Sequence, residues 1–205
     1  MKRCISMSAK RNSIIMSLFI IIPLFNACQE DYTPKPRSYF HIELQEKTYI
    51  PLKIASPFSF EIPSMATIIP KMNPDKTDNW FDIYYPSYNA RIYCSYKTIK
   101  QEEFRKISED NYRFVYQHTI KADAIEGDFF AHPEKRIYGI LYTLMGNTAT
   151  PIQFVATDST THFFRASLYF DCIPNQDSLQ PVINYIKDDI KHIINTLEWK
   201  TSNLN

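Results

Sequence analysis

A stripe of apolar residues near the carboxyl end constrains the fold most. Seven aliphatic side chains recur there at intervals of three and four residues: Val182, Ile183, Ile186, Ile190, Ile193, Ile194 and Leu197. Polar residues such as Asn184 and Lys191 occupy the other positions, so the pattern predicts an amphipathic helix capped at Asp177 or Ser178, with Pro181 in its first turn. Burying seven such side chains contributes roughly 10–20 kcal/mol before chain entropy is subtracted. A helix with this stripe needs a sheet to cover.

Short runs rich in aromatic and β-branched residues supply the strands of that sheet. Alternation predicts strands at residues 39–44, 57–63, 80–85, 90–96, 137–145, 152–157 and 162–172. Turns are predicted at 86–89 and 158–161, and strand ends with a loop at 64–79. Residues 101–122 lack proline and glycine and are predicted as a helix. The sequence therefore predicts an α+β fold, an antiparallel sheet covered by helices, in one domain of residues 39–200 followed by a flexible tail at 201–205.

Composition excludes several classes of function. A chain of 205 residues, 44% of them hydrophobic, can bury one core and is too short for two large domains. Its three glycines, Gly127, Gly139 and Gly146, cannot build either of the glycine-rich loops that hold nucleotide phosphates. A formal charge of +1 provides no basic face for nucleic acid. We therefore expect neither a nucleotide nor a nucleic acid among the partners.

The amino terminus has the pattern of a lipoprotein signal peptide over residues 1–27. Four basic residues precede an apolar run at 14–25, which is too short to span a membrane. Ala27 and Cys28 end a sequence similar to a bacterial lipobox, so we predict cleavage before Cys28 and acylation of its thiol, for example with palmitate. Residues 28–38, polar with two prolines, are predicted as an extended tether. Soluble secretion and an uncleaved anchor are the alternatives.

Removing the signal peptide changes the formal charge from +1 to −3, because residues 1–27 contain four basic and no acidic side chains. The acyl chains, rather than a basic surface, would then hold the protein to the membrane. Gln29 disfavours retention at the inner membrane by the enteric sorting rule, and Glu30 and Asp31 only weakly resemble a surface-export tag. We expect a lipid-anchored envelope protein at the outer membrane, on the periplasmic side rather than the cell surface.

Two cysteines, Cys94 and Cys172, remain in the domain, both in runs predicted as strands. Two buried thiols are the favoured interpretation, although an extracytoplasmic compartment would also permit a disulfide.

Catalytic chemistry finds little support in the sequence. Asp158, Ser159 and His162 lie within five positions, but a tight turn cannot place a nucleophile, a base and an oxyanion site around one substrate. No two of the five histidines are three to five residues apart, as metal ligands on one element would be. We therefore predict no enzymatic activity, no metal and no cofactor.

Two polar groups are candidates for partner binding. His118, Lys121 and Asp123 fall at the end of the predicted middle helix. Gln153, His162 and Arg165 fall on two strands joined by a short turn, where they could form one polar strip. Structural hydrogen bonding at the helix end is the alternative for the first group, and an ordinary solvated sheet face is the alternative for the second. Several tyrosines offer a further aromatic surface, with core packing as their alternative: Tyr84, Tyr85, Tyr88, Tyr93 and Tyr96.

Five ordered blocks resemble the gliding motility-associated lipoprotein GldD family of Bacteroidetes: residues 28–37, 57–63, 116–125, 146–154 and 157–165. The resemblance implies an accessory lipoprotein of the gliding machinery and the associated type IX secretion system, part of an envelope protein complex, to which no enzymatic activity is attributed. Residues 58–63 and the helix ending at 197–199 are also similar to the PsbP-like fold, which implies a sandwich of sheet and helices.

The predicted function is therefore that of a membrane-anchored, non-enzymatic accessory component of gliding and type IX secretion. The alternative is an extracytoplasmic ligand-binding or hydrolytic lipoprotein that uses the polar strip of Gln153, His162 and Arg165 together with His118.

Overall fold

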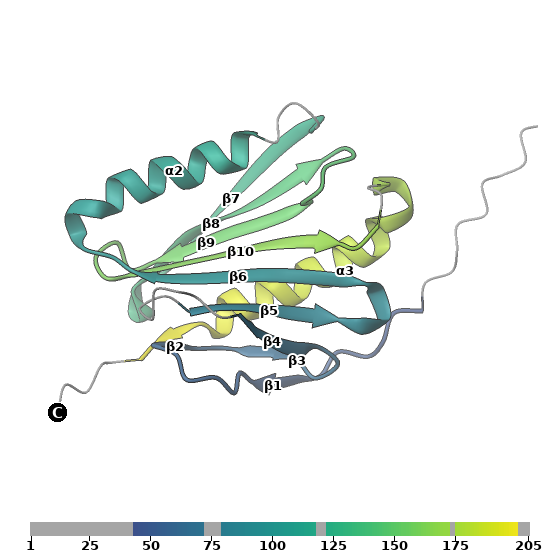
Figure 1. Ribbon diagram of the computed structural model, residues 1–205, viewed down its shortest axis with the longest axis horizontal. Helices are drawn as coiled ribbons and strands as arrows, with labels where there is room; N and C mark the ends of the chain where they lie inside the picture. The colour runs from purple at the N-terminus through teal and green to yellow at the C-terminus, as the bar shows by residue number, and fades with distance from the viewer. Residues whose placement is uncertain (1–42, 72–78, 118–121, 173–174, 201–205) are drawn as a thin grey trace, which may run out of the picture. The chain divides into compact units, whose positions relative to one another are not determined.

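The computed structural model describes residues 43–71, 79–117, 122–172 and 175–200, which are built around a seven-stranded antiparallel sheet (Figure 1). The strands of this sheet are β4 (Thr67–Lys71), β5 (Asn79–Tyr85), β6 (Ala90–Thr98), β7 (Ala124–His132), β8 (Ile137–Met145), β9 (Ile152–Thr157) and β10 (His162–Phe170). Their order across the sheet is β4-β5-β6-β10-β9-β8-β7, and each neighbouring pair is antiparallel. The predicted α+β class is confirmed, whereas the likeness to the PsbP-like fold stays a prediction.

Two hairpins of the sheet turn in the same way. A single 3-10 turn beginning with proline, η2 (Pro86–Tyr88) or η5 (Pro133–Lys135), follows the first strand. The next residue, Asn89 or Arg136, takes a left-handed conformation with φ of 46° or 52°. Proline fixes φ for the turn, and the left-handed residue ends it, so β6 and β8 can start at once.

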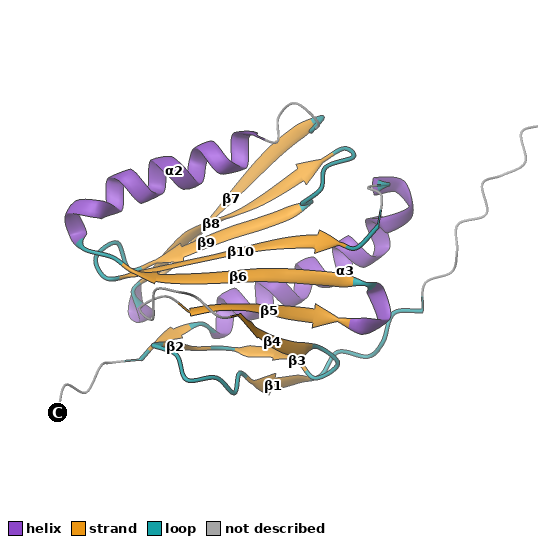
Figure 2. Cartoon of the chain, in the orientation of Figure 1, coloured by secondary structure: helices purple, strands orange, loops and turns teal. Residues whose placement is uncertain are grey.

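Helix α3 (Gln176–Thr196) covers one face of the sheet with the predicted apolar stripe (Figure 2). Two small ribbons complete this core: β1 (Tyr49–Pro51) pairs with β3 (Glu61–Pro63), and β2 (Phe58–Ser59) pairs with β11 (Glu198–Trp199). Phe58 is fully buried, and its ring packs against four aromatic neighbours: Phe60, Phe81, Tyr96 and Phe164. The core therefore joins both ends of the domain to the middle of the sheet.

Helix α2 (Phe104–Tyr116), which follows the 3-10 turn η3 (Gln101–Glu103), packs on the opposite face. Its first turns contact Val155 and Phe163, and its last turn places Val115 against Tyr142. These contacts lie on β8, β9 and β10, so α2 covers one half of this face. In the described part of the chain no helix covers the rest of this face, over β4, β5, β6 and the carboxyl-terminal half of β10, which we call the open face.

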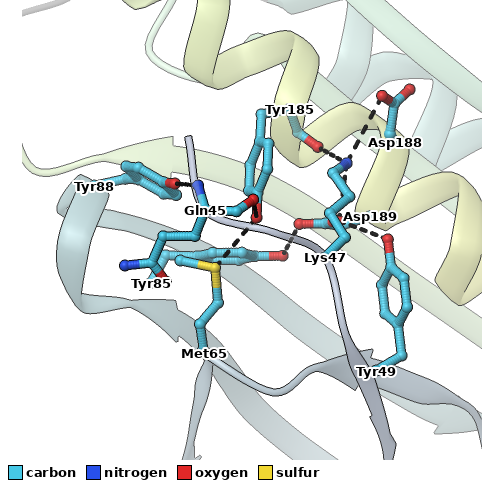
Figure 3. Close-up of polar contacts among 9 residues, drawn as sticks. All are labelled: Gln45, Lys47, Tyr49, Met65, Tyr85, Tyr88, Tyr185, Asp188 and Asp189. Carbon is cyan, nitrogen blue, oxygen red and sulfur yellow. Dashed lines mark hydrogen bonds and ion pairs between the residues drawn. The ribbon is translucent and has the colours of Figure 1, made fainter. Parts of the chain in front are cut away.

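A buried carboxylate on α3, that of Asp189, contacts the segment of residues 45–49 before and at the start of β1 (Figure 3). Asp189 is fully buried; Oδ1 accepts from the Tyr49 hydroxyl at 2.9 Å and lies 3.1 Å from Lys47 Nζ, and Oδ2 accepts from the Tyr85 hydroxyl at 3.3 Å. Lys47 also donates to the backbone carbonyl of Tyr185 at 2.7 Å. Burial raises the pKa of Asp189. Residues 45–49 are thus fixed mainly by polar contacts with α3.

Several predicted boundaries are wrong. The middle helix ends at Tyr116 rather than at 122, and a strand, β7, begins at Ala124 where none was predicted. The region 64–79, predicted as strand ends with a loop, contains a full strand, β4, and the single strand predicted at 57–63 is divided between β2 and β3. Helix α3 begins one residue before the predicted cap, with Asn175 at its N-cap and no side-chain capping bond.

The prediction of two buried thiols is only half confirmed: both cysteines are free, and Cys94 is buried, but Cys172 is exposed.

Other predictions fall outside the described residues: the signal peptide, Cys28, the tether at 28–38, His118, Lys121, the tail at 201–205 and most of the strand at 39–44, whose last two residues are not in a strand. Among the helices that are described, none is both long and apolar enough to cross a bilayer.

Candidate functional site

The structure divides the predicted polar strip between the two faces of the sheet. Arg165 Nη2 donates to Gln153 Oε1 at 3.1 Å on the face that α2 partly covers. Ser167 Oγ donates to the same oxygen at 3.4 Å. His162 lies three residues before Arg165 on β10, and side chains alternate along a strand, so its ring lies on the α3 face. Gln153 and Arg165 are brought together, and His162 is not with them.

His162 is held by aromatic neighbours. Its Nδ1 is hydrogen-bonded to the Tyr96 hydroxyl at 2.7 Å, and its ring stacks on Trp199 with the centroids 4.7 Å apart. Burial lowers the pKa of His162. The imidazole thus helps to fix β11 against the end of β10.

Asp158 organises the predicted hairpin turn, which the structure confirms. Its Oδ1 accepts from the backbone N–H groups of Thr160, Thr161 and His162 at 2.7–3.0 Å, and Oδ2 accepts from the Thr160 hydroxyl. Burial alone would raise the pKa of Asp158, but these bonds outweigh it and lower the pKa to about 2. The carboxylate orients the turn backbone rather than the His162 ring.

The other predicted group cannot be assembled from the described residues. His118 and Lys121 lie outside them, and Asp123 is exposed immediately before β7, not at the end of a helix. The Asp123 N–H donates to the Met145 carbonyl at 2.9 Å, which starts the β7–β8 pairing.

Rows of side chains cross the open face, and their register follows from the strand pairing. One row runs Arg165, Ser95, Trp80 and Lys71 from β10 to β4. The next row contains Ser167, Tyr93 and Asp82, and beyond it lie Tyr169, Arg91 and Tyr84. The two serines are small, so they form the floor of a hollow of about 440 Å³ walled by larger neighbours. We call it the serine hollow; its principal residues are Trp80, Tyr93, Ser95, Arg165, Ser167 and Tyr169.

A buried carboxylate lies beside the hollow. Asp82 is 1% exposed; its Oδ2 lies 3.0 Å from Lys71 Nζ and 3.5 Å from Arg91 Nη1. Arg91 also reaches Asp171, and Lys71 lies over the Tyr93 ring. Lys71 and Arg91 are therefore neutralised locally.

Arg165 differs from these two cations. Its guanidinium is half-buried between Gln153 and the ring of Phe114 on α2, 5.1 Å from the ring centroid. Burial lowers the pKa of Arg165. Among the described residues no carboxylate lies within ion-pair distance of it.

Two polar atoms next to Arg165 and Lys71, Gln153 Nε2 and Asp82 Oδ1, are buried without a hydrogen-bond partner in the described structure.

The hollow combines the side chains that dominate protein interfaces. Trp80 is 45% exposed and Tyr93 37%, although both are large and partly apolar. Tryptophan, tyrosine and arginine supply most interface hot spots because they bury much area and keep a polar end. No group of three or more metal-ligating side chains occurs within the described ranges.

Sequence reasoning found only part of this surface. Of the five predicted tyrosines, Tyr84 and Tyr93 lie on the open face, Tyr85 and Tyr96 are buried in the core, and Tyr88 packs on Tyr185. Trp80, Tyr169 and the two serines were missed. Alternation along β5, β6 and β10 places them on one face, but it does not say which half of that face a helix leaves uncovered.

Comparison with known families decides the identity. The family model for gliding motility lipoprotein GldD matches residues 29–199, which include every strand and both α-helices of the described residues. The chain belongs to the GldD family. No curated protein matches it. As a GldD-family member it is a gliding motility lipoprotein, which means a lipid-anchored protein of the cell envelope and part of a motility machinery. The open face lies wholly within the matched region.

Proposed function

We propose that this GldD-family lipoprotein is a non-enzymatic accessory component of the gliding machinery and the type IX secretion system. Lipid on Cys28 holds it to the outer membrane, and the domain faces the periplasm. It docks on a protein complex of the envelope through the open face. The observation that carries this proposal is the serine hollow, where exposed aromatic rings surround a cation that has no acidic partner among the described residues.

Two features of the serine hollow favour docking: its exposed aromatic rings and a cation without an acidic partner among the described residues. A partner that covered Trp80 and Tyr93 would remove large apolar surfaces from water, at roughly 25 cal/mol per Å². A carboxylate supplied by that partner would pair with Arg165 in a partly desolvated position, where charge-assisted bonds are strongest. Lys71 and Arg91 already pair with Asp82, so Arg165 is the cation available to a partner.

The alternative, a ligand-binding or hydrolytic lipoprotein built on the polar strip, has less support. It needs Gln153, His162 and Arg165 on one surface, and His162 lies on the other face of the sheet. The Asp158 carboxylate is engaged by backbone amides, so it does not orient a base.

A genetic test uses the full-length chain in a gliding host. The double variant Trp80→Ala/Arg165→Gln removes the largest exposed ring and the available charge, while glutamine retains a donor for Gln153. Tyr112→Ala is the matched control, because Tyr112 is 52% exposed on α2 and does not line the hollow. We expect normal abundance of both proteins, loss of spreading and of type IX cargo secretion in the double variant, and neither defect in the control.

Three further results would separate the parts of the proposal. Cys28→Ala should release the protein from membranes and reproduce the deletion. Normal spreading and secretion in a clean deletion would reject the proposed role. A defective deletion with a fully active double variant would reject the open face as the docking site and leave the role intact.

A further inference from the structure

Strand β7 is an unprotected edge of the sheet. It pairs with β8 over all nine of its residues, and in the described part of the chain no strand pairs with its outer side (Figure 1). The other edge, β4, is five residues long and contains Pro70 and Lys71, which discourage further pairing. Strand β7 contains neither proline nor lysine. Its outer N–H and C=O groups therefore form a template for one more strand.

The centre of this edge carries the most exposed large apolar side chain of the described residues. Phe129 is 83% exposed and lies at the rim of an apolar pocket of about 280 Å³ beneath α2, with Phe104, Tyr138 and Ile140 also in its lining. An exposed phenylalanine on a free edge strand marks either an interface or an aggregation hazard. The edge also bears two carboxylates, Glu126 and Asp128, near its middle and an imidazole, His132, at its end.

We propose that a second copy of this chain occupies the edge, with the two β7 strands antiparallel and the two-fold axis at Phe129. In this register Phe129 lies opposite the partner's Phe129, and Glu126 lies opposite the partner's His132. Gly127 lies opposite the partner's Ala131, so nothing bulky flanks the ring pair. The pairing joins the sheets of both copies into one continuous sheet, and it uses a surface separate from the open face.

Neighbouring registers are less favourable. Centring the axis on Asp128 places two aspartates directly opposite each other, and centring it on Gly127 places Glu126 opposite the partner's Asp128 twice. Like charges directly opposite on paired strands are destabilising, whereas aromatic pairs and opposite charges stabilise. Centring on Phe130 separates the two Phe129 rings and faces each with an alanine. The edge is thus most self-complementary when its exposed phenylalanine lies on the axis.

Cysteine crosslinking of the lipidated, full-length protein in native membranes tests the register. The variant Phe129→Cys is made with Cys172→Ser, because Cys172 is an exposed free thiol. Directly opposed residues on paired strands have Cβ atoms about 4.5–5.5 Å apart, within reach of a disulfide after small adjustment. We expect mild oxidation to give a covalent dimer of Phe129→Cys and little dimer of Tyr112→Cys, a control at an exposed position on α2.

A charge exchange tests the pairing without a cysteine. Glu126→Lys alone places lysine opposite histidine, and His132→Glu alone places two glutamates together, so each should lower the dimer fraction in sedimentation of the detergent-solubilised protein. The double variant places lysine opposite glutamate and should recover the dimer. Phe129→Lys should give monomer at every concentration; Phe129 is exposed, so its unfolding temperature should stay near that of the unmodified protein.

Several other outcomes would decide for or against the proposal. Monomeric protein with no crosslink at position 129 would overturn it, as would crosslinking of Phe129→Cys only to a different protein. Failure of the double charge variant to recover the dimer would overturn the register. Because the open-face variants leave β7 unchanged, a dimer that persists in Trp80→Ala/Arg165→Gln supports a separate interface, and loss of the dimer there contradicts it.

Discussion

Removing the ammonium group of Lys47 should lower the free energy of unfolding by about 2–3 kcal/mol. Breaking a buried ion pair by deleting one partner costs about 3–5 kcal/mol, because the other charge stays buried without compensation. Asp189 is fully buried, but the Lys47 side chain is 26% exposed, so water already weakens the pair. The hydroxyls of Tyr49 and Tyr85 still donate to the carboxylate after Lys47→Met. The exposure of Lys47 and the two remaining hydroxyl donors place the expected loss below the about 3–5 kcal/mol of a fully buried ion pair.

The loss should depend on pH in a defined direction. Burial raises the pKa of Asp189 above its usual 3.8, so the folded state takes up a proton more readily than the unfolded chain. Stability contributed by this group therefore falls as pH rises through the raised pKa. Without Lys47 the pKa rises further, and a neutral carboxyl group needs no counter-charge. The difference between Lys47→Met and the unmodified protein should be largest near pH 7 and shrink toward about pH 4.

Urea unfolding followed by tryptophan fluorescence at both pH values measures the effect. The double variant Lys47→Met/Asp189→Asn should recover most of the loss at pH 7, because the neutral amide accepts from one tyrosine hydroxyl through its oxygen and donates to the other through its N–H. Lys53→Met, at an exposed lysine, should change stability by less than about 0.5 kcal/mol. Equal losses at both pH values, or no recovery in the double variant, would refute the assignment of the cost to an uncompensated charge.

Three further predictions concern the turn, the sheet and the core. Asp158→Ala should lower the free energy of unfolding by about 1–2 kcal/mol at pH 7. Because the pKa of Asp158 is lowered to about 2, its contribution is lost from the unmodified protein as pH falls from about 4 toward 2, and the thermal unfolding curves of the variant and the unmodified protein should converge in that range. Gly139→Ala should cost about 3 kcal/mol or more in urea, since its Cβ would lie 2.0 Å from the Val155 carbonyl oxygen, whereas Gly127→Ala, with 3.4 Å to its nearest neighbour, should fold normally. Phe58→Ala should lower stability by about 3–5 kcal/mol in the same assay, because its ring is fully buried among four others.

The elements that were predicted correctly are the strands inside the sheet and the helix packed on it. Strands β8 and β9 occupy the predicted residues 137–145 and 152–157, because each lies between two other strands of the sheet and carries a strong apolar pattern. Strand β7 was missed for the opposite reason: it is an exposed edge, and Glu126, Gly127 and Asp128 interrupt any alternation. The apolar stripe of α3 was found because a helix on a core must be amphipathic.

The candidate site could be predicted only in part. His162 and Arg165 are three residues apart on one strand, so alternation alone places them on opposite faces, and the single polar strip could have been rejected from the sequence. Gln153 meets Arg165 because the turn at 158–161 sets the register that makes them diagonal neighbours. The open face could not be predicted, because the half that α2 leaves uncovered is decided by tertiary packing.

The pairing of β2 with β11 has a consequence for biogenesis. Phe58 leaves the ribosome about 140 residues before the strand that pairs beside it, Glu198–Trp199. At roughly 5–20 residues per second, the interval is on the order of ten seconds. During that interval β2 lacks its partner strand β11, so this part of the fold is completed only after Glu198–Trp199 has been synthesised. For a lipoprotein, which crosses a membrane before it folds, pairing between segments so far apart in the sequence favours folding after export rather than during synthesis.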